Sequence, residues 1–462
     1  MQSINQSTAG FYHSTPLIST MVNEGSSGAA MVEVGIREML LLCAMSGLNV
    51  ILTGRTRGGK TMLARAVMEG IFGDNFGFMQ IDASLDESKF KDILFGRIKK
   101  GKSLSEAVEP SKLLTAPGII FDEFNRAPEV IVNKLQNWLT NGMLTFEGGR
   151  EVFPGVMVDG QKYQWKIATI NEGIAYTGTS LIDKATRGRF SVQIPMDVFI
   201  PTEQDRRDII EKGPFSVSVR AESKKQDSSK LKKLRRLEEK LSGESRRGSD
   251  AAKDNSGSLQ GALFELNKEV KQVPIRGDAT EFLLYLLKKD HCYRSPTGTK
   301  LGFENFTVER CKGCHAWALN GGICGSVFAP TEGTISELKR LASAFAIYRN
   351  YVAPDTKTEV VAGDVIAVSP FVLYKKMDIA DAWVEKNGSG SGWEATNTAV
   401  KMMYQNFTTG TDELRDIYEK SVNGEELTEE DKKLIISVVR KDPAIGTLED
   451  VKEVRKANKI KR

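Results

Sequence analysis

Five short apolar runs mark the first part of the chain, each separated from the next by a stretch long enough for a helix or a loop. They lie at residues 49–52, 78–82, 118–123, 165–171 and 190–196. Runs of this length are typical of strands that are buried on both faces of a sheet. Residues 31–46, before the first run, have the spacing of a helix. The alternation predicts a parallel sheet covered by helices, in an α/β domain at 31–200.

The pattern changes after residue 200, where no further strand is predicted. The sequence PTEQDRRDIIEKG at 201–213 is typical of a capped helix, and helical spacing returns at 259–270, 279–289 and 336–350. A charged helical stretch follows the GSGSG sequence at 388–392. We therefore expect a small helical domain at 201–380 and a charged helical tail at 381–462.

Two segments are too polar to belong to a core. Residues 1–30 are rich in Ser, Thr and Gly without a period, which predicts a flexible tail. Residues 215–258 are dominated by Ser, Lys, Arg, Glu and Gly, which predicts a solvated insertion. Within it Leu231, Leu234, Leu237 and Leu241 share one helical face. A transient solvated helix is the favoured interpretation, and a docking or coiled-coil helix is the alternative.

Composition narrows the class of protein. The chain has 462 residues, of which 40% are hydrophobic and 27% are charged, as in ordinary globular proteins. The first residues lack the pattern of a signal peptide, and no run reaches membrane-spanning length. Four of the five cysteines lie close together late in the chain, which does not suit a disulfide scaffold. We expect a reduced, cytoplasmic protein without a membrane partner.

The net charge of +4 is unevenly distributed. Residues 220–254 hold 12 Lys and Arg against 7 Asp and Glu, a local excess of +5 that leaves about −1 for the rest of the chain. A basic surface over the whole protein is therefore excluded. Any electrostatic attraction to nucleic-acid phosphates would have to come from this one segment.

The clearest motif is GRTRGGKT at residues 54–61, which lies after a predicted strand and before a predicted helix. Its glycines allow backbone N–H groups to surround phosphate oxygens, the following helix presents its positive end, and Lys60 neutralises the terminal phosphates. Thr61 is expected to bind magnesium. The residues predicted to contact the nucleotide are Gly54, Arg55, Thr56, Arg57, Gly58, Gly59, Lys60, Thr61 and Met62.

A second motif, GIIFDEFNRAP, places two carboxylates at the end of an apolar strand. Adjacent carboxylates in such a position are costly unless they have a task. Asp122 is predicted to bind Mg²⁺ through water, and Glu123 to polarise the water that attacks the terminal phosphate. This division of roles is the one that phosphoryl transfer from ATP requires.

Two further segments complete the predicted site. Asn171, in ATINEG, ends another apolar run, where its amide can orient the attacking water. Arg187 and Arg189 precede the next run, and a cation there can stabilise the transition state in a neighbouring subunit, as an arginine finger does. Two solvated arginines are the alternative for this pair.

These four segments resemble Walker A, Walker B, sensor 1 and the arginine-finger segment of AAA+ ATPases. The sequence FDEFNRAP, the stretch at 142–171 and the RF, IP and P pattern after Arg187 resemble the MoxR branch, which is related to McrB, dynein-like and NorQ/CbbQ proteins. The resemblance covers residues 31–377. It implies a three-layer α/β domain with a helical lid, and a ring, expected to have six subunits, with ATP between subunits. It also implies that the loops at 146–164 face the central pore or a partner.

One departure concerns the lid. The branch usually carries an arginine, sensor 2, near the start of the helix that matches ISELKRLASAFA, but this chain has PTEGTIS there. Lys339 or Arg340 is a possible substitute, and absence of the contact is the simpler interpretation. The departure bears on how the lid responds to nucleotide, and not on the hydrolytic residues.

A cysteine cluster lies between two predicted lid helices. Cys292, Cys311, Cys314 and Cys324 have the spacing C-x18-C-x2-C-x9-C, within a predicted insertion at 290–326. Four thiolates form a closed tetrahedral shell for zinc, so a structural Zn²⁺ is the favoured interpretation. A redox switch and an iron–sulfur centre are the alternatives. Cys43, on a helix among Leu and Ala, is expected in the core.

Three functions follow from these residues. The first is an ATP-dependent, chaperone-like ring motor that remodels or matures a partner protein, and the resemblance implies a von Willebrand A domain protein as partner. The second is a nucleic-acid motor of the McrB kind, disfavoured because the segment at 220–254 has mixed charge and lacks interleaved aromatics. The third is a scaffold that binds nucleotide without hydrolysis, against which Asp122, Glu123 and Asn171 argue.

Overall fold

The computed structural model describes most of the chain. The described residues are 18–23, 29–56, 58–95, 111–146, 149, 151–172, 184–198, 203, 259–288, 330–442, 445, 448–458 and 460. They fall into two compact units. The first consists mainly of Glu33–Ser180 and Pro195–Glu269, and the second mainly of Val270–Arg462 with the short segments Thr20–Val32 and Leu181–Ile194.

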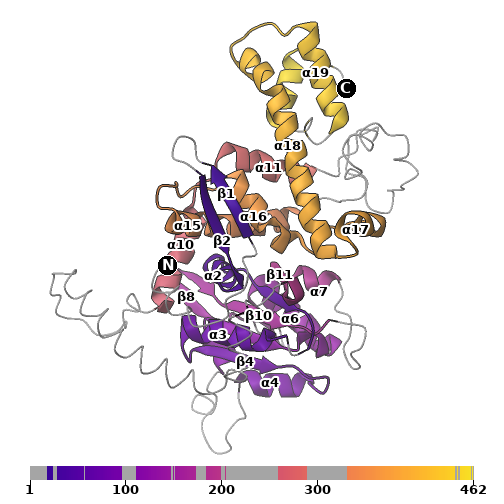
Figure 1. Cartoon of the computed structure of the whole chain (residues 1–462). Coiled ribbons are helices and arrows are strands. Elements are labelled where there is room, and N and C mark those ends of the chain that lie inside the picture. The colour runs from indigo at the N-terminus through magenta and orange to yellow at the C-terminus, as the bar shows by residue number, and fades with distance from the viewer. Residues whose placement is uncertain are drawn as a thin grey trace, which may run out of the picture. The chain divides into compact units, whose positions relative to one another are not determined.

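A five-stranded sheet is the centre of the α/β part of the chain (Figure 1). Its strands are β3 (Val50–Thr53), β4 (Phe76–Gln80), β5 (Gly118–Asp122), β10 (Trp165–Thr169) and β11 (Val192–Pro195), in the order β11-β3-β10-β5-β4. The pairs β3/β10, β5/β10 and β4/β5 are parallel. The five predicted strands are thus confirmed. Because parallel strands end at the same edge, β3, β5 and β10 deliver their carboxyl-terminal residues to one place.

The described residues of the α/β part also form helices. They are α2 (Ile36–Ser46), α3 (Lys60–Phe72), α4 (Glu87–Phe95), α5 (Lys112–Thr115) and α6 (Glu129–Asn141), followed much later by α10 (Leu259–Gln272). Helix α3 contacts β4, β5 and β10 through a buried stripe that includes Leu63, Ala64, Val67 and Met68. A Cβ at Gly118 would lie 2.6 Å from Met68 Sδ, so only glycine permits this close approach.

Two small hairpins precede β10. Strand β6 (Leu144–Thr145) pairs with β7 (Glu151–Val152), and β8 (Val156–Val158) pairs with β9 (Gln161–Tyr163). The segment expected to be loops at 146–164 therefore contains short strands. Phe153 and Met157 are 51% and 59% exposed, so this segment presents apolar side chains to solvent.

The amino-terminal region differs from the sequence expectation. The sequence predicts no element before residue 31 and a helix from residue 31, yet β1 (Ile18–Asn23) pairs with β2 (Ala29–Val34) and the helix begins only at Ile36. Two short strands stabilise each other by backbone hydrogen bonds, and a run such as ISTMVN is too mixed to signal a strand by its own pattern. Residues 1–17 lie outside the described residues.

The second unit is largely helical. It contains α11 (Gly277–Lys288), α15 (Glu332–Val352), α16 (Ala362–Leu373), α17 (Asp381–Gly388), α18 (Gly392–Val422), α19 (Glu429–Lys441) and α20 (Glu449–Ala457), together with α7 (Lys184–Gly188). Helix α16 packs on α11, α15 and α18, and α18 also contacts α19 and α20 (Figure 1). The helices predicted at 259–270, 279–289, 336–350 and after 392 are confirmed. The domain limits at residues 200 and 380 stay predictions.

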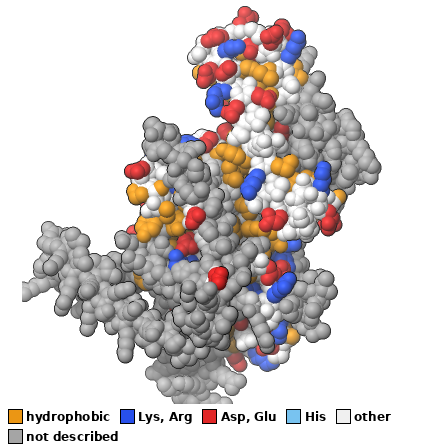
Figure 2. Space-filling model, viewed as in Figure 1, with side chains coloured by type: hydrophobic (Ala, Val, Ile, Leu, Met, Phe, Trp, Pro, Cys, Tyr) orange, Lys and Arg blue, Asp and Glu red, His pale blue; other side chains and the backbone are white. Residues whose placement is uncertain are grey.

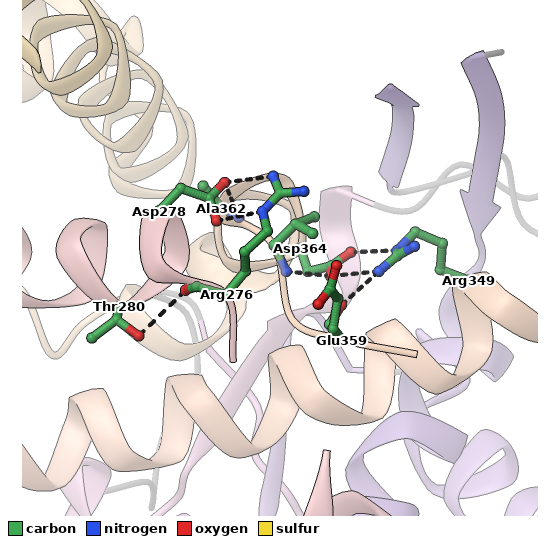
Figure 3. A network of polar contacts seen from close by, with 8 residues as sticks. Arg276, Asp278, Thr280, Arg349, Glu359, Ala362 and Asp364 are labelled. Carbon is green, nitrogen blue, oxygen red and sulfur yellow. Dashed lines mark hydrogen bonds and ion pairs between the residues drawn. The ribbon is translucent and has the colours of Figure 1, made fainter. Parts of the chain in front are cut away.

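A buried ion pair holds the start of α16. Arg349 and Asp364 are both fully buried, and the guanidinium donates to the two carboxylate oxygens at 2.9 and 3.2 Å (Figure 3). Arg349 also donates to the carbonyl of Glu359 at 2.7 Å, and Asp364 accepts from Val361 N at 3.0 Å. Every charged group is paired, which is the condition for burying charge in a core.

A neighbouring network joins α11 to the same turn. Arg276 donates to both oxygens of Asp278 at 2.8 and 2.7 Å, and Asp278 accepts from Ala362 N at 3.4 Å (Figure 3). Backbone bonds from Arg276 N to Val360 O and from Val360 N to Pro274 O, both 2.9 Å, add a short bridge. The amino-terminal ends of α11 and α16 are thereby held in one arrangement.

Acidic and basic side chains are interspersed over α18 and α19 in the view of Figure 2. On α19, Lys432 and Lys433 directly follow Glu429, Glu430 and Asp431, and Lys432 pairs with Glu429 at 2.8 Å. In this view, neither sign of charge forms a continuous patch over α18 and α19. No helix among the described residues is long and apolar enough to cross a membrane.

Candidate nucleotide site

The loop at residues 54–61 follows β3 directly and ends in α3. Gly54 has φ +141° and Gly59 has φ +77°, conformations that side chains rarely adopt, and Gly58 N donates to Arg55 O at 3.2 Å. Gly59 is the residue before α3, so its left-handed backbone turns the chain into the helix. The loop has the form that directs N–H groups at phosphate oxygens. Arg57 lies outside the described residues.

Lys60 is the first residue of α3 and is only 5% exposed. Its ammonium donates to Gly54 O at 2.9 Å and to Arg55 O at 2.6 Å, so the side chain reaches back across the loop to the two residues at its start. Phosphate oxygens compete well for such a donor, because a charged acceptor makes a stronger hydrogen bond than a carbonyl. Met62, in contrast, is 41% exposed.

Asp122, the last residue of β5, is the centre of the site. Its Oδ1 accepts a hydrogen bond from Thr61 Oγ1 at 2.6 Å and another from Thr169 Oγ1 at 2.6 Å. Thr61 comes from α3 and Thr169 from the end of β10, so three elements meet at one carboxylate oxygen. Asp122 is 8% exposed, which limits access of bulk water to the group.

Glu123 has an unusual backbone. It adopts φ +57° and ψ +42°, a left-handed conformation that costs a non-glycine residue roughly 1–2 kcal/mol. Its N–H donates to Thr169 Oγ1 at 3.1 Å, its carbonyl accepts from Arg126 N at 2.9 Å, and its carboxylate pairs with Arg126 Nε at 3.2 Å. These contacts hold a conformation that turns the side chain away from the line of the strand.

The segment after β10 reaches the same place. Glu172 N donates to Gly54 O at 3.1 Å, and Asn125 Nδ2 donates to Asn171 O at 3.2 Å. Asn171 is thus fixed by its backbone between the loop at 54–61 and the turn after β5, with a half-buried side chain. The structure therefore brings together three of the four predicted segments.

Arg187 and Arg189 lie at the end of α7 and just after it. Arg189 is exposed, its N–H bonds to Thr186 O at 3.1 Å, and Gln193 Nε2 donates to Arg187 O at 3.4 Å. Their predicted task is in a neighbouring subunit, so it stays a prediction.

Oxygen ligands suit magnesium, and the site offers them. The hydroxyl of Thr61 and the carboxylate of Asp122 are hard donors within hydrogen-bonding distance of each other, which fits a hydrated Mg²⁺ held next to phosphates. Among the described residues no group of three or more His, Cys, Asp or Glu side chains could hold a metal ion. The cysteines at 292, 311, 314 and 324 lie outside the described residues, whereas Cys43 is fully buried, as predicted.

Two residues of the site escaped the sequence reasoning. Thr169 stands two positions before Asn171, on the face of β10 that Trp165 and Ile167 occupy, and nothing in its spacing separates it from a core residue. Asp197 lies in the short 3₁₀ turn η4 (Met196–Val198), and its carboxylate oxygen is 3.4 Å from the position of a Cβ at Gly54. Only the fold places η4 beside the loop at 54–61.

Residues 49–190 match the model of the AAA domain, dynein-related subfamily. The chain carries an AAA+ ATPase domain. The match spans β3, β5 and β10 with the loop, the carboxylates and Asn171, and it stops at Phe190. AAA+ domains hydrolyse ATP, and the proteins that carry them commonly form rings.

Three proteins illustrate what this chain is similar to. It is 30% identical over 116 residues to the ATP-dependent protease ATP-binding subunit-like protein AmiB of Pseudomonas aeruginosa, which covers 23% of this chain and 30% of AmiB. The chain therefore spans less than a third of that relative. A crystal structure of a proposed ATPase from Cytophaga hutchinsonii has 14% identity and a TM-score of 0.48, covering 79% of this chain and 87% of that one. A full-length MCM homolog from Methanopyrus kandleri has 14% identity and a TM-score of 0.38, covering 74% of this chain and 55% of that one.

Proposed function

We propose that this protein is an ATP-driven ring motor that remodels or matures a partner protein. The observation that carries the proposal is the meeting of Thr61, Thr169 and Asp122 at two hydrogen bonds of 2.6 Å, beside the loop that holds Lys60. The AAA+ domain match supports ATP as the nucleotide. A protein that only bound nucleotide would not need Glu123 held next to this cluster in a costly backbone conformation.

Each residue of the proposed site has one task. Lys60 and the N–H groups of residues 54–62 bind the phosphates, and Thr61 and Asp122 hold Mg²⁺ directly or through water. When bound, Mg²⁺ would neutralise charge that develops on the phosphates. Glu123 accepts a proton from the attacking water, and Asn171 orients that water. Arg189, with Arg187 beside it, stabilises the transition state from the next subunit.

The ring and its client are further parts of the proposal. An arginine finger requires a neighbouring subunit, and the family resemblance favours six subunits in the cytoplasm with a helical lid at 201–380 on each. The exposed Phe153 and Met157 of the segment at 146–164 offer apolar contacts to a client protein. A von Willebrand A domain protein is the partner that the resemblance to the MoxR branch suggests.

Zinc is proposed for the four cysteines. A closed shell of Cys292, Cys311, Cys314 and Cys324 would join the chain on either side of the insertion at 290–326, between α11 and α15. Elemental analysis of protein purified under reducing, chelator-free conditions should find one zinc per chain. Cys311→Ser and Cys314→Ser should lose it, and Cys43→Ser should keep it. Finding iron with visible absorbance, or no metal, would contradict the proposal.

ATP turnover of the purified protein tests the main proposal. Glu123→Gln should bind ATP and hydrolyse it slowly, whereas Lys60→Ala should lose binding. The rate is then measured with DNA, with RNA and with proteins captured by Glu123→Gln, which should hold ATP and client together. Stimulation by a captured protein supports the proposal. Stimulation by DNA or RNA alone would favour a nucleic-acid motor, and equal turnover by Glu123→Gln and the parent protein would overturn the site.

A further inference from the structure

We propose that Thr169 is a positioning residue of the ATPase reaction, which ties the magnesium side of the site to the side that activates water. This inference rests on the proposed function, because it assigns a role within the same site. Thr169 is the last residue of β10 and is 2% exposed. Its hydroxyl contacts both carboxylate residues of the adjacent strand, once through a side chain and once through a backbone N–H.

The hydroxyl uses its donor and an acceptor at the same time. Thr169 Oγ1 donates to Asp122 Oδ1 at 2.6 Å and accepts from Glu123 N at 3.1 Å. A hydroxyl has one proton to donate, so its orientation is fixed by Asp122. Because Thr61 donates to the same oxygen at 2.6 Å, Oδ1 is occupied from two sides, and the carboxylate has one preferred rotation. With this rotation fixed, the second carboxylate oxygen, Oδ2, is the one that can bind a hydrated cation.

The contact with Glu123 N affects the other half of the reaction. Glu123 directly follows β5 and is in the left-handed conformation, so the chain turns at this residue. The N–H of Glu123 donates a hydrogen bond to the Thr169 hydroxyl. Removal of the hydroxyl leaves this N–H without its partner and allows the turn to relax toward ordinary extended backbone. The Glu123 carboxylate would then move away from the water it activates. One hydroxyl therefore sets two positions.

A threonine at this point could serve the core alone, and in that case valine would replace it well. Valine has the same shape and the same preference for strands, but no hydroxyl. Serine keeps the hydroxyl and loses a methyl group. The pair Thr169→Val and Thr169→Ser thus separates packing from hydrogen bonding. Thr396→Val is a matched control, because Thr396 is also 2% exposed and its hydroxyl donates within α18, to Gly392 O at 2.8 Å.

The experiment compares the full-length parent protein with these three variants. For Thr169→Val we expect kcat for ATP to fall about 10–100-fold while KM changes less than about threefold, the range found when a residue that orients a metal ligand is removed. The Mg²⁺ concentration for half-maximal rate should rise several-fold. Thr169→Ser should recover most of kcat, and Thr396→Val should match the parent.

A second readout does not depend on turnover. Binding of a fluorescent ATP analogue is measured with Mg²⁺ and with EDTA, and the gain in affinity due to Mg²⁺ should shrink in Thr169→Val but not in Thr169→Ser. Equal kcat and equal Mg²⁺ response in Thr169→Val and the parent would overturn the inference. So would equal losses in valine and serine variants with equally lowered melting temperatures. A parent protein that hydrolyses no ATP contradicts the proposed function, while the Mg²⁺-dependent binding still tests Thr169.

Discussion

Thr61 at the start of α3 donates a hydrogen bond of 2.6 Å to Asp122 at the end of β5, across 61 positions of sequence. The bond joins the phosphate-binding loop to the carboxylate that would hold Mg²⁺. The bond joins the two side chains that would hold a magnesium ion beside the phosphates, directly or through water. The two proposed metal ligands are thus already in direct contact, which would lower the cost of gathering them when MgATP binds.

Thr61→Ala is expected to weaken MgATP binding much more than binding of ATP in EDTA, because the hydroxyl serves the cation and not the phosphates. Thr61→Ser should retain most of both. Titration of an ATP analogue by fluorescence, with and without Mg²⁺, checks this. Equal losses in the two conditions would show that Thr61 acts on the loop and not on the metal.

Gly54→Ala should disable the nucleotide site. Gly54 has φ +141°, and an added Cβ would lie 3.3 Å from Met196 Cβ and 3.4 Å from Asp197 Oδ1. The strained backbone would shift the loop, so we expect ATP affinity to fall at least about tenfold. Gly333→Ala is the control, since its added Cβ meets nothing closer than 3.8 Å in the first turn of α15. Normal ATP binding by Gly54→Ala would contradict the proposed role of this conformation.

Lys166 predicts how stability depends on pH. It is 4% exposed on β10, and burial lowers its pKa from 10.5 to about 7. Between these values the unfolded chain keeps the proton and the folded protein loses it, so the free energy of unfolding rises with pH across this window. Below pH 7 the folded protein carries the full cost of the buried cation. Above pH 10.5 the group is neutral in both states and the cost disappears.

Lys166→Met should therefore stabilise the protein by roughly 3–5 kcal/mol at pH 6, with the gain falling toward zero near pH 10.5. Urea unfolding at several pH values, compared with the exposed-site control Lys401→Met, measures the difference. The methionine loses the hydrogen bond from Lys166 Nζ to Gln164 O at 3.2 Å, which offsets part of the gain. A gain independent of pH would show that folding does not lower the pKa of Lys166, and that the methionine acts through packing.

Arg349→Met should destabilise the second unit by about 3–5 kcal/mol, because it leaves Asp364 fully buried without its cation. The double variant Arg349→Met with Asp364→Asn should recover part of the loss. Thermal unfolding followed by circular dichroism checks both variants. If the single and double variants unfold at the same temperature, the pair contributes through packing and not through charge.

Arg189→Ala is expected to lose ATP hydrolysis while it keeps ATP binding, because the guanidinium acts on the site of the next subunit. Mixing this variant with Glu123→Gln subunits should restore activity, since some interfaces then combine an intact finger with an intact Glu123. Hydrolysis rates across a series of mixing ratios measure the effect. Rates that never exceed the sum of the two separate variants would exclude an action between subunits.

The sequence alone determined the α/β fold and indicated an ATPase domain. Strands buried on both faces need near-continuous apolar runs, which are visible in the sequence. The motif GRTRGGKT and the adjacent carboxylates Asp122 and Glu123 indicate a nucleotide site by their residue types and their order. Such local patterns can be recognised without knowing which residues are neighbours in the folded protein. Apolar spacing likewise predicted the helix that ends at Ser46 and the helices after residue 259, but it wrongly began the first of these at residue 31 instead of Ile36.

Only the tertiary structure decided which side chains complete the site. Thr169 and Asp197 are separated in sequence from the motifs they contact, and their types and spacing also suit a strand interior and a surface turn. The strand order β11-β3-β10-β5-β4 places the end of β10 beside the end of β5, and that placement turns Thr169 into a partner of Asp122. Likewise, the charge of Arg349 is stable in a core only because the fold brings Asp364 and Glu359 O to it. Long-range pairing of this kind depends on the packing of whole elements, which no local pattern contains.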